Sequence, residues 1–306
     1  MGIGVIGFAD ALDLLKPDIM VLLGDRFEIL AAAQAAMIAR IPIAHLHGGE
    51  ATEGLIDEAI RHAITKMSHF HFVAADPYRS RVIQMGESPE KVFNFGAPGL
   101  ENISRLDLLT KSELEKALNF KLGKINFLVT FHPTTLQKHG TENSTKELLS
   151  ALDNFPEAHI IFTKTNADTD GRIINKLIDT YVQKASNRMR AFTSMGQLHY
   201  LSLIKYIDAM IGNSSSGIIE APAMKKATVD IGDRQKGRLK APSIIECKET
   251  SKAIISGINK ALSEDFQKSL GDMTVSYNME DTSVKIKNFL KKASLTGVLL
   301  KTFHKI

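Results

Sequence analysis

The stretch that decides the fold runs from residue 18 to residue 62 and reads DIMVLLGDRFEILAAAQAAMIARIPIAHLHGGEATEGLIDEAIRH. An apolar run at 19–23 predicts a strand that ends at Gly24-Asp25-Arg26, and a helical segment follows it. A second apolar run at 41–44 predicts another strand, which ends in the charged, glycine-containing segment HLHGGE at 45–50. In parallel α/β sheets, ligands bind at the carboxyl ends of the strands. The stretch therefore predicts a Rossmann-like unit with a site for acid–base chemistry on a polar ligand.

The composition is that of an ordinary globular protein and excludes several classes of function. The chain has 306 residues, a hydrophobic content of 44% and a net charge of +4, with no basic block of the kind that binds nucleic acid. No apolar run approaches the roughly 20 residues of a membrane span. The single cysteine, Cys247, forms no intrachain disulfide, which is typical of the reducing cytoplasm. We therefore expect a cytoplasmic protein without nucleic-acid or membrane partners.

Strand and helix patterns alternate in two successive blocks along the rest of the chain. This alternation is typical of parallel sheets covered by helices, and it predicts two Rossmann-like domains that face one cleft. We place the first domain at residues 1–108 and the second at residues 109–280. Residues 281–306 form a predicted helical tail that packs back on the first domain.

The first predicted element of the chain is a helix and not a strand. An amphipathic helix, with Ile6, Phe8, Leu12 and Leu15 roughly on one side, precedes the first predicted strand. In a parallel sheet, such a helix normally crosses over from an earlier strand. We therefore expect an incomplete first domain with an open sheet edge, and with it low activity, poor solubility or stabilisation by a partner subunit.

Three clusters at predicted strand ends mark the second domain as the nucleotide-binding one. The segment GNSSSG at 212–217 follows a strand and precedes a helix predicted at 218–224, so its serines and free amides would bind a phosphate; the alternative is a well-capped helix. Glu220 would reach a ribose or be an ordinary surface residue. Arg234, in the basic loop GDRQKGR, would pair with a diphosphate or be solvated. His132, in FHPTT, follows another strand. Together the clusters favour a nucleoside diphosphate.

The ionisable residues of the first domain allow more than one interpretation. His45 and His47 lie two apart on a predicted strand, so their side chains would face one way and, with Glu50, could bind a metal. We disfavour this because no supporting shell for a metal is identifiable. Asp25 and Asp57 would be either catalytic groups or caps of the helices that follow them.

Several of these motifs together resemble those of one enzyme family. VLLGDRFE, HLHGGE, GLIDEAIRHAITKMSH, FHPTT, GNSSSGIIEAP and GDRQKGR occur in the order found in the hydrolysing UDP-N-acetylglucosamine 2-epimerases, and the resemblance continues to the LLKTFHKI ending. It implies a GT-B fold of two Rossmann-like domains, with UDP bound mainly by the second. It also implies that Met1 corresponds to a point inside the family's first domain.

The resemblance implies site residues for both domains. Asp25 and Asp57 match catalytic positions, and since His47 stands where some members carry a glutamate, the acid–base role passes to His47 or Glu50. His132, Ser214, Ser215, Glu220 and Arg234 match UDP-binding positions. The full set that we predict to bind substrate or UDP comprises Arg26, His132, Asn166, Asn213, Ser214, Ser215, Gly217, Glu220 and Arg234, with no metal ligand.

The implied activity is the elimination of UDP from UDP-N-acetylglucosamine and hydration of the resulting 2-acetamidoglucal, which gives N-acetylmannosamine for sialic acid synthesis. A first alternative is the same reaction on a UDP-2,4-diacetamido-2,4,6-trideoxyhexose of legionaminic acid synthesis. Alternatives of another class are a GT-B glycosyltransferase and a truncated, inactive nucleotide-sugar binder. No cofactor is expected, the partner is a UDP-sugar, and a homo-oligomer (dimer or tetramer) is expected.

Overall fold

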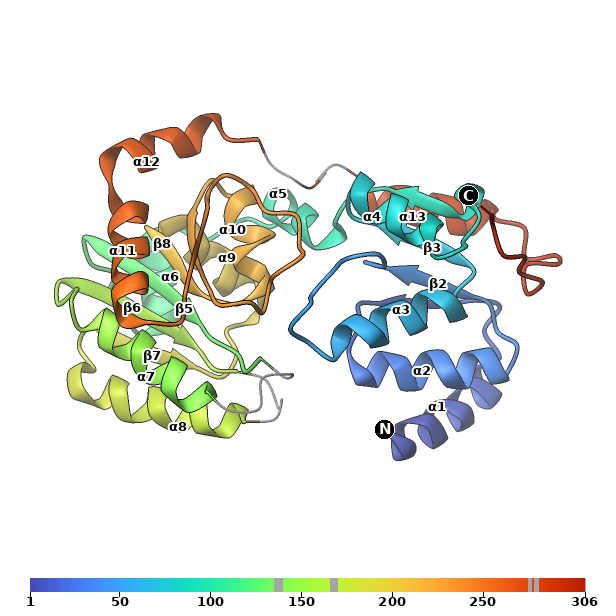
Figure 1. Cartoon of the computed structure of the whole chain (residues 1–306), viewed down its shortest axis with the longest axis horizontal. Coiled ribbons are helices and arrows are strands. Elements are labelled where there is room, and N and C mark those ends of the chain that lie inside the picture. The colour runs from blue at the N-terminus through green and yellow to red at the C-terminus, as the bar shows by residue number, and fades with distance from the viewer. Residues whose placement is uncertain (135–139, 166–169, 275–276, 278–280, 306) are drawn as a thin grey trace. The chain divides into compact units, whose positions relative to one another are not determined.

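The computed structural model describes residues 1–134, 140–165, 170–274, 277 and 281–305. The chain divides into two compact units (Figure 1). Unit 1 consists of residues 1–52, 56–101 and 277–306, and unit 2 of residues 53–55 and 102–276. Each unit contains one parallel sheet with helices, which confirms the predicted α/β class.

The sheet of unit 1 has four parallel strands in the order β1-β2-β3-β4. Helices α2, α3 and α4 connect successive strands, as expected for parallel pairs, and α1 precedes the first strand. The bounds are α1 Gly2–Leu15, β1 Met20–Leu23, α2 Phe27–Ile38, β2 Ile43–Leu46, α3 Asp57–Met67, β3 Phe70–Val73, α4 Asp76–Gln84 and β4 Val92–Asn94.

An aromatic cluster joins the C-terminal part of the chain to this sheet. Helix α13 (Thr282–Lys292) brings Phe289 against Phe70, Phe72 and Phe93, with ring centroids 5.3, 5.5 and 4.4 Å away. Phe70 and Phe72 are almost fully buried, and such aromatic pairs stabilise a core beyond the area they bury. The helix therefore completes the core of unit 1 on this face of the sheet.

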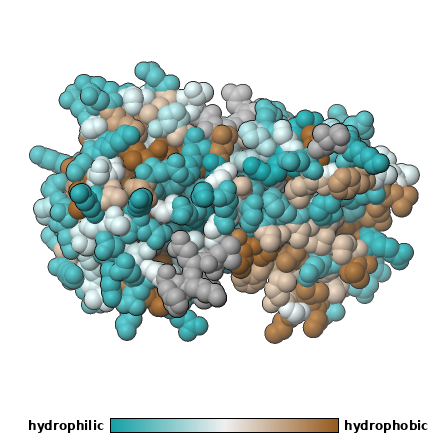
Figure 2. All heavy atoms as spheres, in the orientation of Figure 1, coloured by the Kyte–Doolittle hydropathy of each residue, from teal (hydrophilic) through white to brown (hydrophobic). Residues whose placement is uncertain are grey.

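The opposite end of unit 1 exposes apolar side chains. Strand β1 is at one edge of the described sheet, and its Val21 and Leu23 are 49% and 56% exposed. On α1, Ile3 and Leu14 are more than four-fifths exposed. Figure 2 shows the hydrophobic colour gathered over α1 and α2.

The sheet of unit 2 has six parallel strands in the order β10-β9-β8-β5-β6-β7. The order changes direction between β5 and β8, and crevices for ligands form at such switch points. The strands are β5 Ile125–Thr130, β6 Ala158–Thr163, β7 Met189–Phe192, β8 Ala209–Gly212, β9 Ala227–Ile231 and β10 Ile244–Cys247. The longer helices of this unit are α6 Lys111–Leu118, α7 Thr141–Leu152, α8 Gly171–Val182, α9 Gly196–Tyr206 and α11 Ser251–Leu262.

The helix predicted at 218–224 is wrong in length. After a 3-10 turn, Ser215–Gly217, the structure has only the four-residue helix α10, Glu220–Ala223. Pro222 accounts for this, because proline donates no backbone hydrogen bond and its ring crowds the preceding turn. A four-residue helix has little macrodipole, so the predicted phosphate site loses that part of its support.

Candidate functional site

The polar site of unit 1 is organised around the guanidinium of Arg61, on α3. Its Nε and Nη2 donate to Oδ2 of Asp25 at 2.8 and 2.6 Å. Nη1 donates to the Glu50 carbonyl and to Oε2 of Glu58, both at 2.7 Å, and Nη2 also donates to Oγ1 of Thr52 at 2.7 Å. Arg61 is fully buried, and all five of its donors are used. We call these five residues the Arg61 cluster.

Glu58 of the Arg61 cluster is held in its charged form, and Asp25 is fixed in place by the same guanidinium. Burial opposes ionisation of Glu58, but hydrogen bonds from His62, the Thr52 amide and Arg61 outweigh it and lower the Glu58 pKa to about 2. Asp25 does not cap α2, whose N-cap is Arg26 with no side-chain cap bond. The alternative of Asp25 as a helix cap is therefore wrong, and its carboxylate is fixed instead by Arg61.

His47 and Glu50 form a second pair next to the Arg61 cluster. Nδ1 of His47 lies 2.7 Å from Oε1 of Glu50. The Glu50 side chain is 3% exposed and that of His47 19%, so the carboxylate is buried behind a more accessible imidazole. A carboxylate that binds one imidazole nitrogen fixes the tautomer and leaves the other nitrogen basic. This pair has the parts of an oriented general base.

His45 is a structural histidine. It is fully buried, with Nε2 2.9 Å from the Gly24 carbonyl and Nδ1 3.2 Å from Oγ1 of Thr65. Burial lowers its pKa to about 3, so the ring is neutral. The prediction that His45 and His47 share one face is wrong, because β2 ends at Leu46 and His47 adopts a left-handed conformation with φ of 64°.

Two further predicted residues, Asp57 and Arg26, stand at the starts of α3 and α2. Asp57 is the first residue of α3, and the N-cap is Ile56, so Asp57 is not the cap. Arg26 is the N-cap of α2, and its Nε lies 3.3 Å from Oε2 of Glu28. Their roles with substrate stay predictions.

In unit 2, Asn213 joins three strand ends. Its Oδ1 accepts a hydrogen bond from the His132 amide at 2.7 Å, and its Nδ2 donates to the His132 carbonyl at 2.8 Å. Its own carbonyl accepts from Nη1 of Arg234 at 3.1 Å and from Nε2 of Gln235 at 2.8 Å. Asn213 is 1% exposed, and its side chain and its backbone carbonyl together connect the loops after β5, β8 and β9.

A cavity of about 460 Å³ opens at these strand ends, within unit 2. Hydroxyl groups dominate its lining, and the hydroxyls of Thr130 and Thr163 share a hydrogen bond. The Nδ1 atom of His132 lies 2.8 Å from Oγ1 of Thr165. The predicted residues His132, Ser214, Ser215 and Arg234 line this cavity, together with Thr130, Thr163, Lys164, Thr193, Ser194, Met195, Gly196, Gln197 and Tyr200.

The remaining predicted ligands of unit 2 lie behind or beside the cavity. Gly217 permits close packing, since a Cβ atom there would stand 2.8 Å from Cγ2 of Thr228. Burial raises the pKa of Tyr200, which lines the cavity, and the charge of Glu220 raises it further, although Glu220 itself is not among the lining residues. Asn166 lies outside the described residues.

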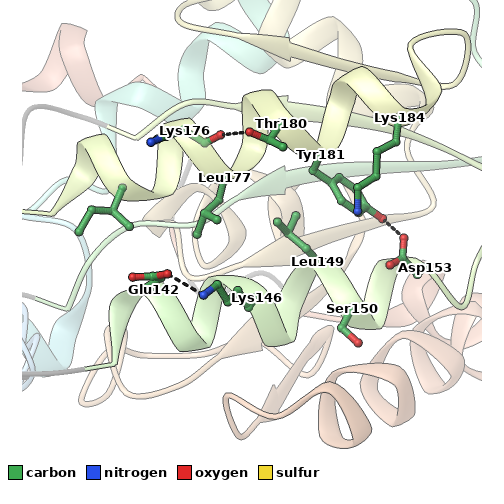
Figure 3. Close-up of a pocket in the computed structure, with 11 residues that line it drawn as sticks. Glu142, Lys146, Leu149, Ser150, Asp153, Lys176, Leu177, Thr180, Tyr181 and Lys184 are labelled. Carbon is green, nitrogen blue, oxygen red and sulfur yellow. Dashed lines mark hydrogen bonds and ion pairs between the residues drawn. The ribbon is translucent and has the colours of Figure 1, made fainter.

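A different groove lies between α7 and α8 (Figure 3). Leu149 and Leu177 form its apolar part, and the Tyr181 hydroxyl donates to Oδ1 of Asp153 at 2.8 Å. Lys146 pairs with Glu142 at 2.6 Å. None of the predicted site residues lines this groove, whereas four of them line the strand-end cavity.

The sequence interpretation missed the roles of Arg61, Glu58 and Thr52. The available signal was the helical spacing of Glu58 and Arg61, which puts neighbouring charges on one side of α3. Within the described residues there is no group of three potential metal-ligating side chains, and no helix is long and apolar enough to cross a membrane.

Comparisons with known proteins identify the family. A family model for UDP-N-acetylglucosamine 2-epimerase matches residues 1–291. A GDP/UDP-N,N'-diacetylbacillosamine 2-epimerase (hydrolyzing) from Campylobacter jejuni is 43% identical over 99% of the chain and 79% of its own length. The polysialic acid biosynthesis protein P7 of Escherichia coli is 40% identical, with 95% and 75% covered. A UDP-N,N'-diacetylbacillosamine 2-epimerase (hydrolyzing) from Legionella pneumophila is 35% identical, with 86% and 69% covered.

A solved structure confirms the architecture. Methanocaldococcus jannaschii UDP-GlcNAc 2-epimerase, in complex with UDP-GlcNAc and UDP, superimposes with a TM-score of 0.81 at 18% identity, over 95% of this chain and 80% of that one. At that identity the likeness concerns the fold, which is GT-B-like. The family model matches nearly the whole sequence, and the fold agrees with it. The chain therefore belongs to the UDP-N-acetylglucosamine 2-epimerase family.

Proposed function

We propose that this protein is a hydrolysing nucleotide-sugar 2-epimerase whose substrate is a UDP-2,4-diacetamido-2,4,6-trideoxyhexose. The observation that carries the proposal is the similarity to two relatives described as hydrolysing diacetylbacillosamine 2-epimerases, at 43% and 35% identity. The alternative substrate considered from the sequence is thereby favoured over UDP-N-acetylglucosamine. The latter stays a second candidate, supported by the 40% identity to a polysialic acid biosynthesis protein.

The strand-end cavity of unit 2 is the proposed UDP site. Its volume of about 460 Å³ is within the usual range for small-molecule sites, roughly 300–1,000 Å³. Arg234 supplies a planar fork of donors for the diphosphate, and Ser214 and Ser215 supply hydroxyls. Donors at the diphosphate stabilise the negative charge that develops as the C1–O bond breaks.

The ionisable residues of unit 1 are the proposed acid–base groups. In the first step a base removes the proton from C2, the C2–H electrons form the C1=C2 bond, and the C1–O pair leaves with UDP. In the second step water adds its hydroxyl to C1, and a proton returns to the opposite face of C2. The His47–Glu50 pair and Asp25 are the groups that we assign to these proton transfers, with Asp57 as a further candidate.

Incubation with synthetic substrates tests the proposal. UDP-diacetamido-trideoxyhexose, its GDP analogue and UDP-N-acetylglucosamine are supplied separately in D₂O, and NMR follows the sugar. We expect release of UDP and a free 2-epimeric sugar with deuterium at C2, fastest from the diacetamido substrate. An epimeric sugar still joined to UDP would contradict the hydrolysing reaction, and faster turnover of UDP-N-acetylglucosamine would reverse the choice of substrate.

A further inference from the structure

The C-terminal tail of the chain is attached to α3, the helix that carries Arg61. The Nζ atom of Lys301 lies 2.9 Å from the Lys66 carbonyl and 2.5 Å from the Ser68 carbonyl, both at the C-terminal end of α3. Its third partner is Oε2 of Glu87, at 2.8 Å. An ammonium group has three donors, so Lys301 is saturated by these contacts.

Glu87 makes this attachment strong because it is buried and multiply bound. Its side chain is 3% exposed and also accepts from Nζ of Lys66 at 2.6 Å and pairs with Nε2 of His71 at 3.0 Å. A buried carboxylate needs such partners, since removal of one leaves uncompensated charge. Lys301 therefore joins the end of α3 to the segment after α4, and Glu87 extends this contact to His71 on β3.

Two neighbouring residues hold the tail in register. Phe303 lies over Gly86, where a Cβ atom would stand 2.4 Å from its ring, and Gly86 also adopts a φ of 88° that favours glycine. The His304 amide donates to the Gly86 carbonyl at 2.9 Å. The Phe303 ring also lies 5.3 Å from Nζ of Lys66. We call Lys301, Phe303 and His304 the tail latch.

The tail latch contacts the helix that also carries Arg61. A cation at the C-terminal end of a helix satisfies its last carbonyls and interacts favourably with its dipole. The N-terminal half of α3 carries Asp57, Glu58 and Arg61, and Arg61 holds Asp25. We propose that Lys301 is a positioning residue for the reaction: it fixes α3 and, through it, the Arg61 cluster. The catalytic part of this inference rests on the proposed function.

The test compares Lys301→Met, which removes the charge, with Lys305→Met, an exposed lysine of the same tail as the matched control. Hydrogen exchange of the full chain should show α3 amides opening about tenfold faster in Lys301→Met, with β2 and α2 unchanged. With the accepted substrate, kcat should fall about tenfold while KM stays within about twofold, since small misplacements of catalytic groups cost rate.

Further variants keep the proposal falsifiable if Lys301→Met folds poorly. Glu87→Gln should reproduce the exchange change, and Lys301→Arg, which keeps the charge, should restore much of kcat. Faster exchange throughout unit 1 with unchanged kcat would overturn the positioning role. If the wild-type chain turns over no nucleotide sugar, the proposed function fails, whereas unchanged α3 exchange in Lys301→Met and Glu87→Gln would refute the latch itself.

Discussion

The candidate sites of the two units are built from different chemistry. In unit 1, a buried guanidinium holds Asp25 and Glu58, so the arrangement depends on charge. In unit 2, the neutral amide of Asn213 holds the backbone of His132 on both sides. Breaking a buried ion pair costs more than breaking a neutral hydrogen bond, and only the former responds to pH. The difference predicts that the arrangement in unit 1 is sensitive to the loss of a single charge, whereas the arrangement in unit 2 is not.

The largest expected effect is on turnover, from Asp25→Asn. The amide is nearly isosteric but neutral, so it cannot take part in proton transfer or balance the Arg61 charge. We expect kcat to fall about 10²–10⁴-fold, the usual contribution of general acid–base catalysis, with UDP affinity unchanged. Steady-state kinetics and calorimetric titration of UDP measure the two effects. The exposed Asp10→Asn on α1 is the control, and retention of most of the rate would remove Asp25 from the mechanism.

Arg61→Met tests how far unit 1 depends on charge. It leaves Asp25 and Glu58 without their shared partner, and breaking a buried pair in this way costs about 3–5 kcal/mol. Urea unfolding followed by circular dichroism measures the loss, and hydrogen exchange of α2 and α3 reports unit 1 separately. The exposed Arg172→Met on α8 should change stability by no more than about 0.5 kcal/mol. Equal stability of the two variants would contradict the comparison.

Arg234→Ala tests the ligand surface of unit 2. Loss of a charge-assisted contact to a diphosphate should weaken UDP binding by about 1.5–3 kcal/mol. Calorimetric titration of UDP is the measurement. The control is Lys236→Ala, in the same loop. Lys236 is exposed and pairs with Glu53, so this variant should bind UDP with unchanged affinity. Unchanged affinity in the Arg234 variant would move the diphosphate away from this loop.

The smallest expected effect is the pH dependence that His45 gives unit 1. Its pKa is about 3 in the fold and 6.5 as a free side chain, so between these values the unfolded chain binds one more proton. Stability should therefore fall as pH falls, by about 1.4 kcal/mol per pH unit from this residue. Burial also lowers the pKa of His69, to about 4, so the total slope is steeper. His45→Gln should reduce the slope between pH 6 and 5 by one proton's worth, and an unchanged slope would contradict the assignment.

Much of the fold follows from local sequence signals. The sequence pattern predicts clear helices at 251–262 and 282–292, and α11 and α13 occupy these residues. The Thr250 hydroxyl caps α11 by accepting from the Ala253 amide, a start signal that is visible in the sequence. Strand β10 was missed, since the chain after the Gly232–Arg238 loop reads as helical. Its four residues include the exposed Glu246, so neither length nor apolar content marks it as a strand.

The candidate site could be predicted from the sequence less completely than the fold. Strand ends could be recognised, because glycine and charged residues follow short apolar runs. The partner of Asp25 could not, because Arg61 lies 36 residues away and meets it only once α3 is packed. His45 and Asn213 are further examples, since their side chains satisfy buried backbone or hydroxyl groups that only the folded chain brings together.

The division of unit 1 into separated segments sets an order for synthesis on the ribosome. Residues 1–101 emerge first, but α13, which covers Phe70, Phe72 and Phe93, is translated only after all of unit 2. Domains generally fold as units during synthesis, so unit 2 can complete its sheet while unit 1 still exposes these rings. Nascent unit 1 therefore keeps these rings uncovered until α13 has been translated and can pack on them.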